Sequence, residues 1–474
     1  MTKLVPIMMI VLMTTTAICA AQDVRIHSAT DIAHEFTFYW DGRFATQYTA
    51  ADGGVDARIW GTLHKYDTTN VNLLILPAGA TPCPYTAKDI AAVRDFLESG
   101  GGVLFLGSYG TFRTEADYRA NALAKAFEAE FVDVTATQPL KPADELGVTE
   151  LESYGGKVVE LARPDEWEIL IADAEGRTVM ARKAVGAGKL IIGCHGQSGH
   201  QPDAKDPINQ EMWTPLLADL VSGKTVDPDK GPPGMYPEHI TEKEALKVQY
   251  SDYMEPMADI IFEQYERALP ILNEICGVPP SPGMLTTLIL LPTGGGGFSS
   301  GVSIGLGVWW GGFPDKMYGM TELIGHEAGH SWVLPFPEPM WNEPIATYIG
   351  AQLAKRLNMN EEADGVITRN IENARKHDPD MNAMDIAYGT DVPNAVYWGK
   401  TMYIWEELSK ERPDALARYF QAKRKLVDPE RMDKYTPDDT AAVMSVAMEK
   451  DLFPWLQSLG LTVDTEKTEI PMEW

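Results

Sequence analysis

Short apolar runs that alternate with segments of helical spacing fill the first half of the chain, and this alternation narrows its possible folds more than any other feature. The run VNLLILPAG (71–79) predicts a buried strand. In the following TAKDIAAVRDFLES (86–99) the apolar residues lie on one helical face, and three glycines end the helix. Strands and helices in this order are typical of an open α/β sheet. We therefore expect an α/β domain over residues 22–224, with further strands at 103–110, 157–161, 168–172, 178–184 and 189–193 and a helix near 115–128.

The sequence changes character after a segment rich in proline, glycine and charge. SGKTVDPDKGPPGMYPEHI has no periodic apolar residues, so we expect a linker at 225–240. A chain of 474 residues that is 45% hydrophobic can bury more than one core. We expect residues 241–474 to form a second domain that is α+β and mainly helical. Its helices are predicted at 257–276, 317–333, 343–357, 395–411, 414–426 and 438–448.

Two strand-like runs, MLTTLILLP and GVSIGLGVWWG, precede the helix at 317–333 and are joined by TGGGGFSS. The glycine run is not a phosphate loop, because no Lys-Ser or Lys-Thr pair follows it. We interpret it as a flexible hairpin connection rather than as a flap that contacts substrate. The second run is a candidate edge strand for pairing with an extended peptide.

The net charge of −28 comes from 40 Lys and Arg against 68 Asp and Glu and repels nucleic acid, so we expect no nucleic-acid partner. MTKLVPIMMIVLMTTTAICAAQDV places one lysine before an apolar run and then small residues, which is the layout of a secretory signal peptide at 1–21. No later apolar run has the length of a membrane span. The protein is expected to be periplasmic or secreted, without an integral membrane anchor. The sequence gives no indication of its oligomeric state.

Three cysteines remain after cleavage, Cys83, Cys194 and Cys276, which is few for an oxidising compartment. At most one disulfide can then form. Cys83 and Cys194 fall in the same half of the chain, but a disulfide needs Cα atoms within about 7 Å, and a sequence does not show that distance. Buried thiols are the simpler interpretation.

The string HEAGH, within MYGMTELIGHEAGHSWV, indicates the chemistry of the second half. The surrounding residues favour a helix, so His326 and His330 are expected one turn apart on one face. Imidazoles at this spacing can bind one zinc ion at about 2.0–2.1 Å, with Glu327 beside the metal. Zinc lowers the pKa of a bound water toward about 7, and a carboxylate can then take its proton as the water attacks a carbonyl.

A catalytic zinc site needs a third protein ligand. The prolines of LPFPEP end the metal helix, and WNEPIATY begins another, with Asn342 as its predicted N-cap and Pro344 in its first turn. Twelve residues separate His330 from Glu343, enough for the chain to reverse and return a carboxylate to the metal. His326, His330 and Glu343 are therefore the predicted ligands of one Zn²⁺ per chain, with a position open for water.

HEAGH followed by WNEPIATY resembles the gluzincin metallopeptidases, whose third ligand is the Glu of an N-E-x-x-A-x-aromatic helix. The spacer between the two strings is similar to that of the enhancin-like, mucin-targeting peptidases. NAVYWGKTMYIWEEL resembles the gluzincin aminopeptidase helix that begins Y-x-K-G, with Gly399 and Lys400 in swapped order. This likeness implies that Tyr397 donates a hydrogen bond to the oxyanion. The G-A-M-E-N loop of the aminopeptidases does not occur, which argues against an aminopeptidase.

The first half resembles the class I glutamine-amidotransferase-like fold over LLILPAGATPCPYTAKDIAAVRDFLESGGGVLFLGSYG and GAGKLIIGCHG. The nucleophile of that family is the Cys of a G-x-C-x-G elbow. The strings LGSYG around Ser108 and IGCHG around Cys194 both lack the leading glycine, and the strained turn of an elbow needs small residues on both sides. We therefore expect this domain to be non-catalytic.

These features together predict an exported zinc-dependent peptidase that hydrolyses peptide or glycopeptide bonds of a peptide, protein or glycoprotein substrate. Glu327 is the expected general base, and Tyr397 the oxyanion donor. One alternative is a non-catalytic carbohydrate or peptide binding protein with a relic peptidase domain. Another is an amidohydrolase or thiol enzyme that uses Cys194.

Overall fold

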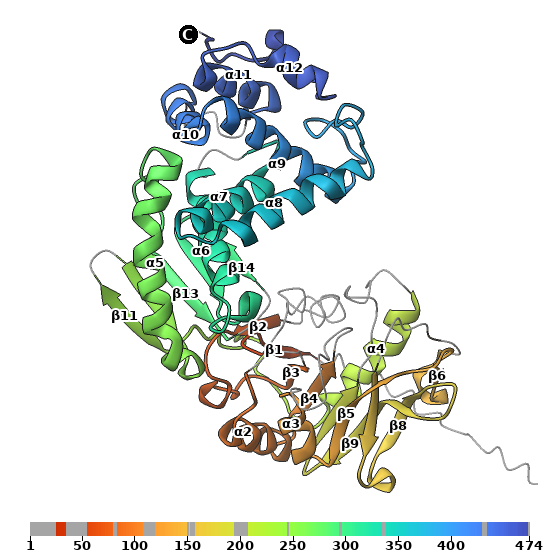
Figure 1. Cartoon of the computed structure of the whole chain (residues 1–474). Coiled ribbons are helices and arrows are strands. Elements are labelled where there is room, and N and C mark those ends of the chain that lie inside the picture. The colour runs from red at the N-terminus through yellow and green to blue at the C-terminus, as the bar shows by residue number, and fades with distance from the viewer. Residues whose placement is uncertain are drawn as a thin grey trace, which may run out of the picture.

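The computed structural model describes residues 25–34, 55–78, 83–107, 119–148, 151, 157–193, 207–243, 246–292, 296–333, 338–428 and 434–472. Figure 1 shows two modules, an α/β module below and a mainly helical module above. The predicted signal peptide, Ser108 and Cys194 lie outside the described residues, so the signal peptide and the elbow comparison stay predictions. Cys83 and Cys276 are buried thiols, as expected.

The first module contains an eight-stranded sheet in the order β2-β1-β3-β4-β10-β9-β8-β6. The first five of these are parallel neighbours, and the last three pair antiparallel. The bounds are β1 (His27–Asp31), β2 (Val55–Ile59), β3 (Leu73–Ala78), β4 (Gly102–Gly107), β6 (Lys141–Pro142), β8 (Glu168–Ala172), β9 (Thr178–Val185) and β10 (Gly188–Gly193). A separate antiparallel pair is formed by β5 (Ala129–Thr135) and β7 (Lys157–Leu161).

Alternate residues of the central strands enter two different cores. Leu74 and Leu76 pack with α2 (Ala87–Glu98) and α3 (Asn121–Ala126), whereas Leu73 and Ile75 pack with α4 (Pro207–Leu220). Since successive side chains of a strand point to opposite faces, helices cover both faces of the sheet. The expected helix near 115–128 is present only as α3 within the described residues.

The second module begins with a five-stranded sheet in the order β11-β12-β13-β15-β14. Its strands are β11 (His239–Lys243), β12 (Leu246–Tyr250), β13 (Thr287–Leu291), β14 (Gly297–Ser299) and β15 (Ser303–Gly307). The hairpin interpretation of TGGGGFSS was wrong, because β13 and β15 are parallel neighbours and part of that segment forms β14. The prediction of GVSIGLGVWWG as an edge strand was also wrong, because this run forms β15 inside the sheet, and the edges of the described sheet are β11 and β14. The last two residues of the expected linker belong to β11.

Eight helices of the second module are described: α5 (Glu255–Cys276), α6 (Met317–Val333), α7 (Asn342–Arg356), α8 (Asn360–Arg375), α9 (Asn394–Glu411), α10 (Ala415–Leu426), α11 (Pro437–Met448) and α12 (Phe453–Ser458). They share one core with the sheet, built from residues between 248 and 463. The sequence analysis missed α8, of which only Ala363, Ile367 and Ala374 are buried. Among the described helices, none is long and apolar enough to cross a membrane.

The two modules meet at the end of the first sheet where β1 and β2 finish (Figure 1). The backbone N–H of Trp60 donates to the carbonyl of Met235, so the linker runs along β2. The hydroxyl of Tyr253, at the start of α5, accepts from the N–H of Leu63 at 3.0 Å. Lys65 pairs with Asp252 at 2.7 Å. Hydrogen bonds and an ion pair thus contribute to the contact between the modules.

Candidate metal centre

Glycines allow α6 and α7 to approach each other at the predicted metal site. A Cβ on Gly325 of α6 would lie 2.6 Å from the Cα of Gly350 in α7. A Cβ on Gly350 would lie 2.5 Å from the carbonyl oxygen of Glu322. Contacts this short exclude any side chain, so the two backbones touch and the first turn of α7 reaches the middle of α6.

The three predicted ligands converge. Nε2 of His326 and Nε2 of His330 are 3.3 Å apart, and Oε2 of Glu343 lies 3.3 Å from the first and 3.7 Å from the second. Two ligands of a tetrahedral zinc ion at about 2.0–2.1 Å from the metal lie about 3.3 Å from each other. The donor set and its spacing therefore fit a zinc ion.

A second group orients one of these ligands. Nδ1 of His326 lies 2.8 Å from the hydroxyl oxygen of Thr347. Thr347 follows Glu343 by one turn of α7, so the two side chains leave the same face of the helix. Ligating histidines commonly hold their second nitrogen in such a hydrogen bond. The sequence analysis missed Thr347, although its spacing of four from Glu343 was visible.

Glu327 lies beside the ligands, and its carboxylate is within 4.8 Å of both imidazoles. It is only 4% exposed. Burial, with the negative charges of Glu343 and Glu322, raises its pKa to about 8. The backbone of β14 lies directly beside Glu327, because a Cβ on Gly297 would lie 2.5 Å from Oε1 of Glu327. A bound cation would favour the carboxylate form, which is the form that accepts a proton.

The charge state of the ligands also suits a metal. Burial lowers the pKa of His326, which favours the neutral imidazole that binds metals. Hydrogen bonds from His326 and His330 hold the pKa of Glu343 far below its usual range. Glu343 is about half exposed, with 51% of its side chain accessible, so the site opens to solvent on this side.

Tyr397, predicted from the α9 string, lies near Glu343. Burial raises its pKa to about 12, and the charges of Glu343 and Glu338 contribute to the shift. Its hydroxyl also hydrogen-bonds the backbone of Asn342. The structure therefore brings all five predicted site residues into one region, from α6, the start of α7 and the start of α9.

The swapped glycine and lysine of α9 have separate structural roles. A Cβ on Gly399 would lie 2.2 Å from the carbonyl oxygen of Asn370, so α8 packs directly against α9 here. Lys400 is fully buried and pairs with Asp378 at 2.7 Å. Lys400 also donates to the carbonyls of Met384 and Leu459, so it holds α9 to the loops around it.

The first module touches the strand next to Glu327. The ring of Trp60 contacts the ring of Phe298 in β14 edge to face, with centroids 5.7 Å apart. On its other side Phe298 packs on Gly305, where a Cβ would lie 2.1 Å from the ring. The sequence analysis gave no signal for this contact between residues more than two hundred positions apart.

Comparison with known proteins leaves the family open. No family model matches the chain, and no curated protein matches it. Among solved structures, an exo-β-1,4-mannosidase from an Opitutaceae bacterium is 18% identical over 41% of this chain and 36% of its own, with a TM-score of 0.29. A cytoplasmic protein from Salmonella typhimurium is 12% identical over 41% of this chain and 99% of its own, with a TM-score of 0.31. A ThuA-like protein from Parabacteroides merdae is 10% identical over 43% of this chain and 92% of its own, with a TM-score of 0.31.

These likenesses carry no functional argument, because identity and structural agreement are both low. The chain spans about a third of the mannosidase that it resembles. The function must therefore be argued from the site itself.

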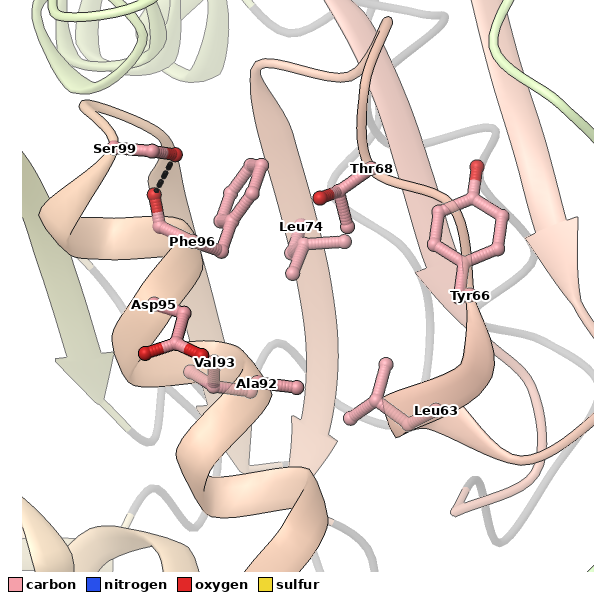
Figure 2. A pocket seen from close by; sticks show the side chains of 9 residues that line it. All are labelled: Leu63, Tyr66, Thr68, Leu74, Ala92, Val93, Asp95, Phe96 and Ser99. Carbon is pink, nitrogen blue, oxygen red and sulfur yellow. Dashed lines mark hydrogen bonds between the residues drawn. The ribbon is translucent and has the colours of Figure 1, made fainter.

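A pocket in the first module is chemically different from the metal centre. Figure 2 shows the side chains that line it, between α2 and β3. Its cavity volume is about 320 Å³. Its wall is mainly apolar, and the hydroxyl of Ser99 is used in a hydrogen bond to the carbonyl of Phe96 at 2.8 Å. Its lining residues are Leu63, Tyr66, Thr68, Leu74, Ala92, Val93, Asp95, Phe96 and Ser99. These residues do not pair a nucleophile with a base, so we do not assign the reaction to this pocket.

Proposed function

We propose that this protein is a zinc-dependent peptidase of the gluzincin type that hydrolyses peptide or glycopeptide bonds. The observation that carries the proposal is the convergence of His326, His330 and Glu343 at tetrahedral spacing, with the buried Glu327 beside them. Bound zinc supplies a Lewis acid that polarises a carbonyl and lowers the pKa of water.

Two side chains of the protein, Glu327 and Tyr397, then take part in the hydrolysis. Glu327 takes a proton from the attacking water, whose oxygen bonds to the carbonyl carbon. The C–N bond breaks, and Glu327 returns the proton to the leaving amine. Tyr397 donates a hydrogen bond to the oxyanion, which favours the transition state over the bound substrate. The raised pKa of Tyr397 keeps its hydroxyl protonated for this role.

The position of the edge strand β14 favours a peptide as the substrate. It lies at the edge of its sheet within the described residues, and Gly297 in it borders Glu327. An extended peptide that pairs with an edge strand gains main-chain hydrogen bonds and presents a backbone carbonyl to the site. We propose that the enzyme meets peptide, protein or glycoprotein substrates in the periplasm or outside the cell, after export through the signal peptide at 1–21.

A library of peptides and glycopeptides, digested with and without a chelator, tests the function. We expect cleavage that stops with chelator and returns with added zinc. Glu327→Gln should retain about one zinc per chain and lose about 10²–10⁴-fold in rate. Glu407→Gln, an exposed carboxylate of α9 that pairs with Lys410, is the matched control and should keep full activity.

Two outcomes would reject the proposal. Full peptidase activity in Glu327→Gln would exclude the mechanism. Zinc bound at one equivalent without hydrolysis of any peptide would favour the alternative, a carbohydrate or peptide binding protein with a relic peptidase domain.

A further inference from the structure

Three buried polar side chains in the first module form a chain of hydrogen bonds. Oδ2 of Asp31 lies 2.7 Å from Nδ1 of His34, and Nε2 of the same ring lies 3.5 Å from Sγ of Cys83. The three side chains are at most 4% exposed. Cys83 is 49 positions from His34 in the sequence, so the fold alone brings them together.

The position of each proton in these hydrogen bonds follows from the chemistry of the three side chains. A carboxylate only accepts, so Nδ1 of His34 donates to Asp31. In the neutral ring Nε2 is then an acceptor, and the thiol of Cys83 donates to it. Transfer of that proton gives a thiolate beside an imidazolium, with Asp31 stabilising the positive charge. Burial opposes the charged ring, but the charges of Asp31 and Cys83 and the hydrogen bonds to both together outweigh it and raise the pKa of His34 well above its usual value.

The position in the sheet is one where α/β proteins bind ligands. Strand β1 ends at Asp31, and Cys83 follows the end of β3. The sheet order β2-β1-β3 means that the chain leaves β1 in one direction for β2 and returns on the other side for β3. The carboxyl ends of strands at such a switch point form the usual binding crevice of an open α/β sheet.

Among the described residues, two aromatic rings contact the imidazole of His34. Tyr85 stacks on the imidazole with centroids 4.0 Å apart, and Tyr253 of the second module meets its edge at 4.9 Å. Asp89 contributes negative charge, and is itself hydrogen-bonded to His64 at 2.8 Å. Burial raises the pKa of both tyrosines, so they stay neutral. The described neighbours of His34 are therefore two neutral rings and negative charge, which suits a ring that accepts the proton of Cys83.

We propose that Cys83, with His34 as its base and Asp31 as the group that orients the base, is a reactive thiol site that takes a small hydroperoxide. The thiolate attacks the distal oxygen, an S–O bond forms and the O–O bond breaks. Sulfur is oxidised to the sulfenic acid, the peroxide is reduced to an alcohol or water, and the proton on Nε2 passes to the leaving oxygen. The small size follows from the low exposure of all three side chains.

Cys276 provides a control within the same molecule. It is also buried, at 0% exposed, and burial raises its pKa well above the usual value for a thiol. Both cysteines are closed to bulk solvent, so burial alone predicts that neither reacts. Only Cys83 has a hydrogen-bonded imidazole of its own among these two described thiols.

The experiment uses the full chain and measures, by peptide mass spectrometry, alkylation by iodoacetamide and dimedone trapping after hydrogen peroxide. At about pH 6 we expect Cys83 to react about 100-fold faster than Cys276, because the thiol of Cys83 can pass its proton to the hydrogen-bonded imidazole, whereas burial disfavours the thiolate of Cys276. Asp31→Asn and His34→Phe should each lower the rate at Cys83 by about 10-fold or more. His64 lies next to the site but is not one of its three hydrogen-bonded side chains, so His64→Gln should leave the rate at Cys83 unchanged.

Equal rates at Cys83 and Cys276, a Cys83 that stays unmodified in the native protein, or one held in a disulfide with Cys194 would each overturn the proposal. The wild-type pH profile decides the matter if a variant does not fold, since a rate at Cys83 that rises only above about pH 8.5 belongs to an ordinary thiol. Peptidase activity does not enter any of these measurements, so the result is independent of the metal site.

Discussion

The hydroxyl oxygen of Thr347 lies 2.8 Å from Nδ1 of His326, while Nε2 of the same ring faces His330 and Glu343. One helix, α7, thus carries a predicted ligand and, one turn later, the group that orients a second predicted ligand. The hydrogen bond fixes the ring in the orientation that leaves Nε2 for a metal. Because both groups sit on one rigid helix, their spacing does not depend on a loop.

We expect Thr347→Val to weaken zinc binding by about 10–100-fold, because the variant keeps the shape of the side chain and removes the oxygen that holds His326. Thr347→Ser should bind zinc as the wild type does. Competition with a chromophoric chelator measures both affinities. Equal affinity in Thr347→Val and wild type would show that the hydrogen bond does not support the ligand.

The helix crossing at Gly350 makes a stability prediction. Alanine has a higher helix propensity than glycine by about 1 kcal/mol, so a free helical position gains from the change. At Gly350 the new Cβ would lie 2.5 Å from the carbonyl oxygen of Glu322 and 3.2 Å from the N of His326. We therefore expect Gly350→Ala to lower the free energy of unfolding by about 1–3 kcal/mol and to weaken metal binding, because it pushes α7 from α6.

Gly365→Ala in α8 is the matched control, since no atom lies within 4 Å of its Cβ position. It should raise the stability by up to about 1 kcal/mol and leave zinc affinity unchanged. Urea unfolding of both variants provides the comparison. A gain in stability from Gly350→Ala would contradict the close crossing.

The convergence of the candidate site residues could be expected from the sequence, because its signals are local. The spacing of His326 and His330 follows from the period of one helix, and Glu343 from the start of the next. Tyr397 came from a resemblance alone, and the structure brings it near Glu343. The predicted ligands could be derived from the sequence once these two helices were assumed to meet.

What the sequence did not reveal depends on how distant elements pack. The approach of Gly325 to Gly350 depends on a helix crossing that periodicity does not encode. The hydrogen bonds from Asp31 through His34 to Cys83 form because β1 and β3 are neighbours in a parallel sheet. The pairing of parallel strands has no signal in the local sequence. The sequence did not reveal β14, because this strand lies next to a glycine run and is too short to show an alternating pattern.

The raised pKa of Glu327 predicts how the metal-free protein responds to pH. Its pKa is 4.5 in the unfolded chain and about 8 in the folded protein, so the folded state binds more protons between these values. The stabilisation is complete below the unfolded pKa and is lost as the pH rises through the folded pKa. In chelator-treated protein, Glu327→Gln should match the wild type near pH 4 and exceed its stability near pH 9 by about 2 kcal/mol or more.

Glu343→Gln should show the opposite sign, because hydrogen bonds from the two histidines lower the pKa of Glu343. Its carboxylate stabilises the fold above the unfolded pKa, and that stabilisation is lost as the pH falls through the lower folded pKa. Thermal unfolding across the pH range checks both variants. Curves for Glu327→Gln and wild type that stay parallel at every pH would contradict the burial of a protonated carboxyl.

The position of Tyr397 beside Glu343 leads to a kinetic prediction that separates its two roles. Tyr397→Phe keeps the ring, which is only partly buried, and removes the hydroxyl that the oxyanion needs. If the hydroxyl acts in the transition state, kcat should fall by about 10²–10³-fold while KM and zinc content stay near the wild-type values. Tyr403→Phe, a tyrosine of α9 whose ring contacts Arg375, is the control and should change neither constant. A rise in KM with kcat unchanged would instead assign Tyr397 to substrate binding, and loss of zinc would assign it to holding the first turn of α7 through Asn342.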